Sequence, residues 1–307
     1  MKSFALAASD GVDVACYHRP TAAPRAVVHI AHGMGEHAQR YDWVGEQFAL
    51  AGLATYANDH RGHGQTGSAG TDQAQGYFGP DGWNRVVADA YELNQHIRAN
   101  HPDVPVILLG HSMGSMLAQH YITRHGSSID GLILSGSPGF KAKSRNPIPG
   151  WILGFETRRV GISGQSPLMQ KLLFSSANND FSSETATGFE WLSRDQSQVD
   201  LYVQDKNCGF VIATGSLRDL QAGAAVAADA AHLACIPKSL PTLVFSGRKD
   251  PVHNGGADVE RMVAAYKDTG LTQVQLRWYA DGRHEMLNET NRDVVVTDLL
   301  QWLETLS

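Results

Sequence analysis

Three polar residues in this chain have the side chains that nucleophilic catalysis needs: Ser112, Asp250 and His284. A serine hydroxyl is a weak nucleophile near neutral pH, so it needs a base to take its proton, and a histidine base needs a carboxylate to fix its tautomer. Each of the three follows an apolar run that predicts a strand. We therefore predict Ser112 as the nucleophile, His284 as the general base and Asp250 as the acid that orients the histidine.

The nucleophile lies at the centre of a Gly-x-Ser-x-Gly pentapeptide, GHSMG at residues 110–114. Apolar residues 106–109 predict a short buried strand before it, and residues 115–124 predict a helix after it. A sharp turn between the two would expose the Ser112 hydroxyl at its tip. The pentapeptide alone is a weak signal because glycine and serine are common. Its setting favours a nucleophile over an ordinary turn serine.

The oxyanion formed on attack needs N–H donors that are already in place. The N–H of Met113 directly follows the nucleophile at the expected helix N-terminus, where backbone N–H groups point outward. A second donor is expected in the glycine-rich loop HGMGEH at residues 32–37, which follows another predicted strand. We choose the N–H of Met34.

Other roles are open to some of these residues. Asp250 could cap the helix that follows it, and His284 could be a surface loop histidine. Asp281 is a rival acid nearer to His284 in sequence, but the glycine after it indicates a turn. For His60 and His63 we favour hydrogen bonds within a compact loop over metal ligation. We expect Asp59 and Arg61 to hold that same loop. His32 and His37 lie in the HGMGEH loop at residues 32–37.

The elements that must position these residues alternate along the chain. Asp10-Gly11 between two alternating runs predicts a hairpin. Helices are expected at residues 41–51, 83–100, 115–124, 217–233, 256–267 and 293–306. Strands are expected at residues 4–7, 12–17, 26–31, 53–57, 106–109, 131–135, 241–246 and 274–279. This alternation predicts the α/β class, with a mainly parallel central sheet, helices on both faces and the hairpin at one edge.

The alternation stops in the middle of the chain, where residues 136–235 contain no strong strand pattern. We therefore divide the chain into a first core part at 1–135, an inserted helical cap at 136–235 and a second core part at 236–307. Ser216 is a plausible N-cap of the helix expected at 217–233. Apolar stretches at 151–155 and 168–174 are expected to be helical. Five residues of these stretches are candidates for binding the substrate: Trp151, Ile152, Phe155, Leu168 and Leu172. Plain packing is an equally good interpretation of them.

Composition excludes several classes of protein. The chain has 307 residues, 42% of them hydrophobic, which fits a globular protein with a large core. A formal net charge of −6 argues against binding to nucleic acid. Three scattered cysteines, Cys16, Cys208 and Cys235, indicate free thiols in a reducing compartment. The sequence has no Cys-x-x-Cys pair of the kind that would suggest a zinc site. We find no signal peptide and no membrane-spanning run, so we expect the cytoplasm.

A modest excess of basic residues lies in the first part of the expected cap: Lys141, Lys143, Arg145, Arg158 and Arg159. A solvated face is the simpler interpretation. The alternative is contact with a phosphate headgroup or with an anionic membrane.

Five motifs, taken in order, resemble one family. They are HGMGEH at 32–37, DHRGHGQTG at 59–67, GHSMG at 110–114, SGRKDPV at 246–252 and DGRHEMLNE at 281–289. The family is the monoacylglycerol lipase and lysophospholipase group of α/β-hydrolases, also called serine aminopeptidase-like hydrolases. Within the cap, WLSRD at 191–195 and DKNCGF at 205–210 resemble bacterial lysophospholipase-like members. The resemblance implies the α/β-hydrolase fold, the triad named above, an oxyanion hole from Met34 and Met113, and a mobile lid over an acyl pocket.

We therefore expect a metal-free, cofactor-free serine hydrolase that cleaves esters of single-chain acyl lipids, either monoacylglycerols or lysophospholipids. The reaction would proceed through an acyl-enzyme on Ser112. A small-ester carboxylesterase and an aminopeptidase-type peptidase or amidase are the enzymatic alternatives. A non-catalytic binding module is disfavoured because all three triad residues are present. The expected partner is an acyl-ester substrate, with weak peripheral contact between the cap and a membrane; the sequence predicts no oligomeric state.

Overall fold

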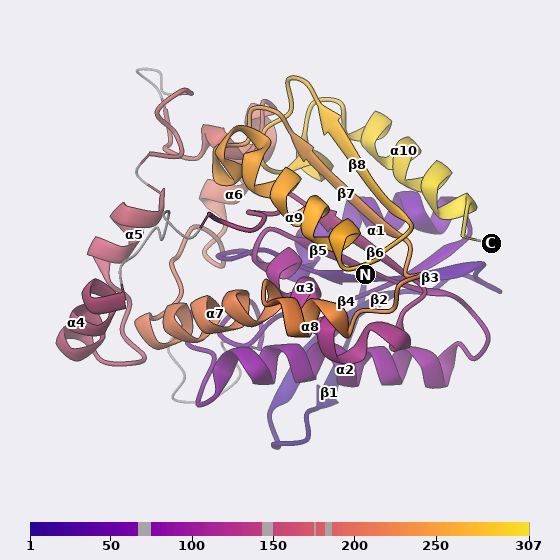
Figure 1. The fold of residues 1–307 in the computed structure, drawn as a ribbon, viewed down its shortest axis with the longest axis horizontal. Coiled ribbons are helices and arrows are strands. Elements are labelled where there is room, and N and C mark those ends of the chain that lie inside the picture. The colour runs from indigo at the N-terminus through magenta and orange to yellow at the C-terminus, as the bar shows by residue number, and fades with distance from the viewer. Residues whose placement is uncertain (67–74, 143–149, 175, 182–185, 307) are drawn as a thin grey trace.

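A mixed eight-stranded sheet forms the centre of the computed structural model, which describes residues 1–66, 75–142, 150–174, 176–181 and 186–306. The strand order is β1-β2-β4-β3-β5-β6-β7-β8 (Figure 1). The strands are β1 (Lys2–Ala7), β2 (Asp13–Arg19), β3 (Ala26–Ala31), β4 (Leu53–Asn58), β5 (Val106–His111), β6 (Gly131–Ser135), β7 (Thr242–Gly247) and β8 (Val274–Tyr279). All of the expected strands are present.

Strands β4, β3, β5, β6, β7 and β8 pair in parallel, whereas β1 and β2 form an antiparallel hairpin at one edge. Gly11 turns that hairpin with a φ of +84°, which favours glycine. The expected antiparallel edge is therefore confirmed. Because parallel neighbours share a direction, the carboxyl ends of β3, β5, β7 and β8 lie at the same edge of the sheet.

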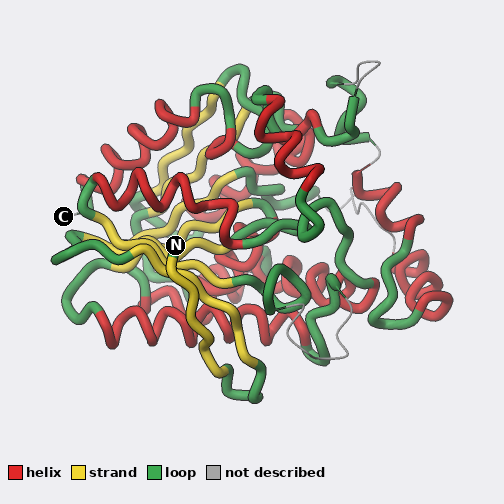
Figure 2. Tube along the Cα trace, turned by 180° about the vertical axis from the view of Figure 1, so that it is seen from behind, coloured by secondary structure: helices red, strands yellow, loops and turns green. Residues whose placement is uncertain are grey.

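Helices cover both faces of this sheet (Figure 2). The core helices are α1 (Asp42–Leu50), α2 (Gly82–Asn100), α3 (Met113–His125), α9 (Ala257–Asp268) and α10 (Arg292–Glu304). Alternate residues of β5 separate the two cores: Ile107 and Leu109 pack with α1 and α10, and Leu108 packs with α2, α3 and α9. Burial on both faces explains why β5 is a continuous apolar run.

Between β6 and β7 the described residues form helices and turns. The helices are α4 (Gly150–Val160), α5 (Pro167–Phe174), α6 (Gln196–Gln204), α7 (Thr214–Ala227) and α8 (Ala230–Ala234). In Figure 1, α4 and α5 lie at one end of the molecule, whereas α7 and α8 run beside α2 and α3. Leu217 and Leu220 of α7 belong to the same apolar cluster as α3. Gly223 lets α7 approach α2, because a Cβ there would lie 2.0 Å from the ring of Trp83.

The single helix expected at 217–233 is wrong in two respects. Helix α7 begins at Thr214, so Ser216 is not its N-cap; the Ser216 hydroxyl instead accepts a hydrogen bond from the N–H of Phe78 at 2.9 Å. The helix also stops at Ala227. The Asp229 carboxylate accepts N–H bonds from the next turn and starts α8 as a separate helix.

Among the described residues, no helix combines the length and apolar character needed to cross a bilayer.

Candidate active site

Ser112 occupies the sharp turn between β5 and α3. Its φ of +50° and ψ of −114° are unusual for a residue with a side chain. The flanking glycines make this turn possible: a Cβ at Gly110 would lie 2.3 Å from the carbonyl oxygen of Gly114, and a Cβ at Gly114 would lie 2.1 Å from that of Ala31. Close packing of strand, turn and helix thus explains both glycines of the pentapeptide, and it holds the serine at the edge of the sheet.

The structure brings together the three residues predicted to act on a substrate. His284 Nε2 lies 2.9 Å from Ser112 Oγ, and His284 Nδ1 lies 2.8 Å from Asp250 Oδ2. The serine follows β5, the aspartate follows β7 and the histidine lies in the loop after β8. This arrangement allows the imidazole to take a proton from the hydroxyl while the carboxylate fixes the tautomer.

Asp250 makes the contacts that both of the roles considered for it require. Its Oδ1 accepts the N–H of Val252 at 2.9 Å and caps the turn that follows, while Oδ2 faces His284 and accepts from the Ser246 hydroxyl at 3.2 Å. The cap fixes the rotamer of the carboxylate that orients the histidine. The rival acid, Asp281, is exposed.

Electrostatics favour charge separation across this pair. Burial alone would lower the pKa of His284, but the adjacent Asp250 carboxylate, with smaller contributions from Glu285 and Glu36, holds that pKa above its ordinary value. Burial likewise works to raise the pKa of Asp250, yet His284 keeps it below the ordinary value. The carboxylate is therefore ionised at neutral pH, where it can stabilise the imidazolium formed during catalysis. His111, whose ring centroid lies 4.9 Å from that of His284, has its pKa lowered by burial to about 4 and adds no opposing charge.

The loop proposed to hold an oxyanion donor is fixed on both sides of Met34. The N–H of Gly33 donates to Glu36 Oε1 at 2.5 Å, and the N–H of Gly35 donates to His63 Nε2 at 3.2 Å. Among the residues that the structure describes, the N–H of Met34 between them has no partner. A Cβ at Gly33 would lie 3.3 Å from Ser112 Cβ, so this loop lies against the nucleophile.

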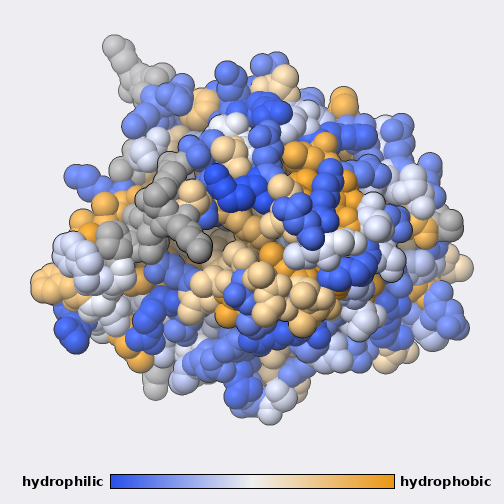
Figure 3. Space-filling view, viewed as in Figure 1, coloured by the Kyte–Doolittle hydropathy of each residue, from blue (hydrophilic) through white to orange (hydrophobic). Residues whose placement is uncertain are grey.

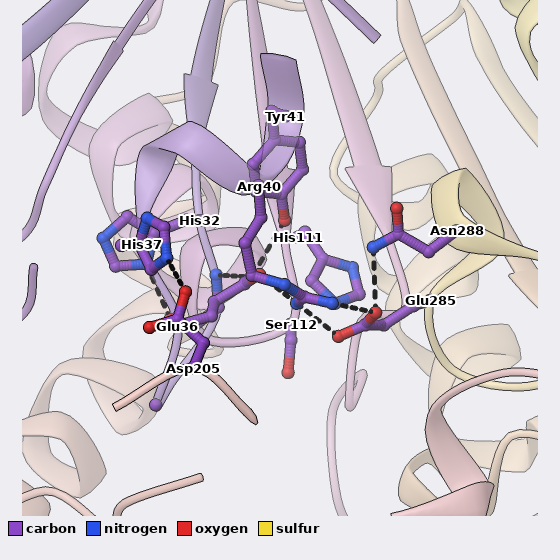
Figure 4. A network of polar contacts seen from close by, with 12 residues as sticks. His32, Glu36, His37, Arg40, Tyr41, His111, Ser112, Asp205, Glu285 and Asn288 are labelled. Atoms are coloured by element: carbon purple, nitrogen blue, oxygen red, sulfur yellow. Dashed lines mark hydrogen bonds and ion pairs between the residues drawn. The ribbon is translucent and has the colours of Figure 1, made fainter. Parts of the chain in front are cut away.

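A buried ion-pair network connects this loop to the histidine loop (Figure 4). Glu36 Oε2 pairs with Arg40 at 2.6 Å, and Arg40 donates two bonds of 2.7 Å to the carboxylate of Glu285, the residue after His284. Burial would raise the pKa of Glu285, but Arg40, together with His111 and Asn288, lowers it to about 2. The network therefore positions the Met34 and His284 loops relative to each other. Sequence reasoning missed it, although two of its members lie inside the quoted motifs HGMGEH and DGRHEMLNE.

The histidines of the neighbouring loop are structural, as expected. The N–H of His60 donates to His32 Nε2 at 3.0 Å, and His63 Nδ1 lies 3.1 Å from the carbonyl oxygen of Arg61. Burial lowers the pKa of His60 to about 3 and that of His63 to about 4, so both are neutral. Asp59 accepts backbone N–H bonds and Arg61 pairs with two carboxylates, which confirms that both hold the loop.

Four of the five cap residues predicted to bind substrate are on the surface. Trp151 is 77% exposed, Phe155 is 62% exposed, and Leu168 and Leu172 are also exposed; Ile152 packs against the core cluster. An acyl-pocket role for these five remains a prediction.

The cap side chain that lies beside the histidine is instead Trp191, whose ring centroid is 4.9 Å from that of His284. Phe174 stacks on Trp191 at 6.0 Å. The sequence analysis quoted Trp191 within WLSRD but did not select it, because no local pattern places it against a histidine 93 positions away.

Comparison with known families gives a match over most of the chain. A family model described as serine aminopeptidase, S33, matches residues 22–291.

Individual relatives agree with this match. A monoacylglycerol lipase from Mycolicibacterium smegmatis is 29% identical over 92% of this chain and 90% of its own length. A monoglyceride lipase from Rattus norvegicus is 32% identical, over 42% of this chain and 41% of its own.

Two solved structures superpose on nearly the whole chain. A lipase in an open form has a TM-score of 0.87 with 27% identity, covering 99% of this chain and 98% of its own. A thermostable carboxyl esterase from Bacillus coagulans, in complex with glycerol, has a TM-score of 0.87 with 25% identity and the same coverage. The α/β-hydrolase fold expected from the motifs is therefore confirmed.

Proposed function

The chain belongs to the hydrolase family described as serine aminopeptidase, S33. From this membership we propose that it cleaves carboxylic esters of single-chain acyl lipids, with monoacylglycerols as the preferred substrates. It is a carboxylic ester hydrolase. The observation that carries the proposal is the hydrogen-bonded chain from Ser112 through His284 to Asp250. The similarity to a monoacylglycerol lipase over 90% of that protein's length supports the choice of substrate.

In the proposed reaction Ser112 Oγ attacks the ester carbonyl carbon while His284 Nε2 takes the hydroxyl proton. The N–H groups of Met34 and Met113 stabilise the resulting oxyanion. The imidazolium then gives its proton to the leaving alcohol oxygen, which leaves an acyl-enzyme on Ser112. Water, activated by the same histidine, releases the fatty acid and restores the serine.

An apolar neighbourhood of the histidine supports an acyl substrate. Trp191 and Phe174 form a stacked pair on the cap side of His284. An acyl chain that entered beside these rings would bury apolar surface, which contributes about 0.8 kcal/mol for each CH₂ removed from water. Neither ring of this pair carries a charge that would attract a charged headgroup.

The outer surface of the cap supports a weak peripheral contact with lipid. Trp151 and Phe155 on α4 and Leu168 and Leu172 on α5 are exposed apolar residues. The end of the molecule that carries α4 and α5 shows orange apolar atoms among polar ones in Figure 3. Arg158 and Lys171 on the same helices are also exposed. Two of the basic residues noted in the sequence, Lys143 and Arg145, lie outside the described residues. We expect tighter co-sedimentation with anionic than with neutral vesicles; equal binding would remove the electrostatic part of this contact.

The deciding experiment is hydrolysis of a matched panel by the wild-type chain and by Ser112→Ala. The panel contains monoacylglycerols and lysophosphatidylcholines of several chain lengths, p-nitrophenyl acetate and an aminoacyl amide. The proposal expects the highest kcat/KM on monoacylglycerols of long chain. A preference for lysophosphatidylcholine would replace monoacylglycerol by lysophospholipid as the proposed substrate. Turnover of the amide alone would overturn the ester assignment.

A short-ester carboxylesterase is the second candidate. The Bacillus coagulans carboxyl esterase supports it, because that structure superposes as well as the lipase does. Turnover of p-nitrophenyl acetate without turnover of any long-chain ester would favour this candidate. The cytoplasmic location expected from the sequence stays a prediction.

A further inference from the structure

A second cluster of reactive side chains lies where the cap meets the oxyanion loop. His37 follows that loop, while Asp205 and Cys208 belong to the turn after α6. A ring nitrogen of His37, an Asp205 carboxylate oxygen and the Cys208 sulfur all lie within 4.8 Å of one another. No step of the proposed hydrolysis uses them.

We infer that His37, Asp205 and Cys208 form a binding site for a divalent transition-metal ion of the Zn²⁺ type. Imidazole nitrogen, thiolate sulfur and carboxylate oxygen are the three donor types that Zn²⁺ takes in proteins. Three protein ligands leave a fourth position for water, and the Asp205 side chain is 32% exposed, so solvent reaches the site. The inference concerns binding alone and does not depend on the ester chemistry.

The spacing needs only a local adjustment. Ligand atoms around one tetrahedral Zn²⁺ stand about 3.5 Å apart, given bond lengths of about 2.0–2.3 Å. His37 Nε2 and Asp205 Oδ2 are already 2.8 Å apart and would separate slightly to admit the ion. Cys208 lies in the turn after α6 and is partly buried, and its sulfur would have to move toward the ion.

The local charge favours a cation. The charged groups that act most strongly on the Cys208 thiol are Arg40 and the carboxylates of Glu36, Asp205 and Glu285. Three of these four groups are carboxylates, which favour a cation at the site. On binding, the thiol proton leaves to solvent, the thiolate and the carboxylate each give one negative charge, and neutral His37 gives the Nε2 lone pair. The complex with a divalent ion is therefore neutral.

The position of the site gives the ion a structural consequence. The N–H of Gly209, next to Cys208, donates to the carbonyl oxygen of Gly35 at 3.0 Å, so the cap turn already rests on the oxyanion loop. A bound ion adds a second and stronger connection between these segments. Sequence analysis predicted no metal site because His37 and Asp205 are 168 positions apart, outside any local ligand motif.

The inference is tested by titrating the reduced full-length protein with Co²⁺ and Zn²⁺. We expect one Co²⁺ per chain, with the visible bands of tetrahedral cobalt and a thiolate-to-cobalt charge-transfer band that Zn²⁺ abolishes. Cys208→Ser should remove the charge-transfer band, and both Cys208→Ser and His37→Gln should weaken Zn²⁺ binding at least tenfold, on the order of a lost ligand interaction. Circular dichroism establishes that each variant is folded.

Matched controls come from the surface of α8 and the residue after it. Cys235 is an exposed cysteine, and His232 is an exposed histidine paired with Asp229 at 3.0 Å. Cys235→Ser and His232→Gln should bind both metals as the wild type does. Absence of the charge-transfer band from the wild-type protein, its loss in Cys235→Ser, or its persistence in Cys208→Ser would overturn the site. In that event the contact between His37 and Asp205 is a hydrogen bond that serves the fold alone.

Discussion

The loops at the carboxyl edge of the sheet and the outer cap helices α4 and α5 differ in how their side chains are held. In the loops, Ser112, Asp250 and His284 each have a fixed partner, and a buried ion-pair network lies beside them. On the cap helices, Trp151 and Phe155 point to solvent. The difference leads us to expect that the chemistry depends on preorganised polar contacts, whereas the exposed apolar side chains of the cap contribute to contact with substrate.

The largest effect on the polar side of this comparison is expected for Asp250→Asn. Asparagine still caps the turn at Val252 but no longer selects the tautomer with the Nε2 lone pair toward Ser112. We expect kcat to fall by about 10⁴-fold with little change in folding. Ester hydrolysis and thermal unfolding measure the two quantities.

Asp281→Asn is the matched control, because Asp281 is exposed in the loop that carries His284. Its kcat should equal that of the wild type. A large loss of kcat in Asp281→Asn with little loss in Asp250→Asn would show that Asp281, not Asp250, orients the histidine.

A smaller effect is expected when the network beside the triad is weakened. Glu36→Gln removes the negative charge that pairs with Arg40 and loosens the loop that presents Met34. We expect kcat to fall about 10- to 100-fold with KM nearly unchanged, less than the loss of an oxyanion donor itself. Glu46→Gln, at an exposed position of α1, is the control. A change confined to KM, or equal effects in both variants, would contradict a positioning role.

The pH profile follows from the direction of the His284 shift. The base is active when neutral, and its pKa lies above the ordinary value of 6.5. Thus kcat/KM should rise about tenfold per pH unit below that pKa and reach a plateau above it. In Asp250→Asn the carboxylate charge is gone and burial remains, so the midpoint should move to lower pH. A midpoint that stays in place or moves upward would contradict the assigned pair.

The smallest effect is expected on the cap. The double change Trp151→Ser and Phe155→Ser removes exposed apolar surface from α4 without touching the triad. We expect KM for long-chain monoacylglycerol presented in vesicles to rise several-fold, with kcat/KM for p-nitrophenyl acetate unchanged. Leu50→Ser, at an 80% exposed leucine on α1, is the control. Equal loss on both substrates would mean that α4 supports the fold rather than substrate access.

The sequence predicted the sheet well because the central strands are continuous apolar runs, the partly buried strand β8 alternates apolar and polar residues, and a turn follows each. Residues 26–31, 131–135 and 274–279 match their strands end to end. The three triad residues could be chosen because each follows such a strand, and parallel strands bring their carboxyl ends to one edge. Local pattern was sufficient wherever position depended on a single element.

Prediction failed where position depended on a distant partner. Glu36 and Glu285 form one network through Arg40, but nothing in either local sequence indicates the pairing. Ser216 is a residue type common at N-caps, yet its hydroxyl accepts a hydrogen bond from the N–H of Phe78, in the segment before α2. Division of the chain at 136 and 235 stays a prediction, since α7 within it packs into the core cluster.

The central claim is that Ser112 is the nucleophile of an ester hydrolase, and an active-site fluorophosphonate tests it most directly. Peptide mass spectrometry should locate one adduct, on Ser112, and residual hydrolysis of monoacylglycerol should fall in proportion to labelling. Ser112→Ala should take no label and lose at least about 10⁴-fold in kcat while unfolding at the wild-type temperature. An adduct on another serine, or a folded Ser112→Ala chain that keeps its activity, would contradict the account.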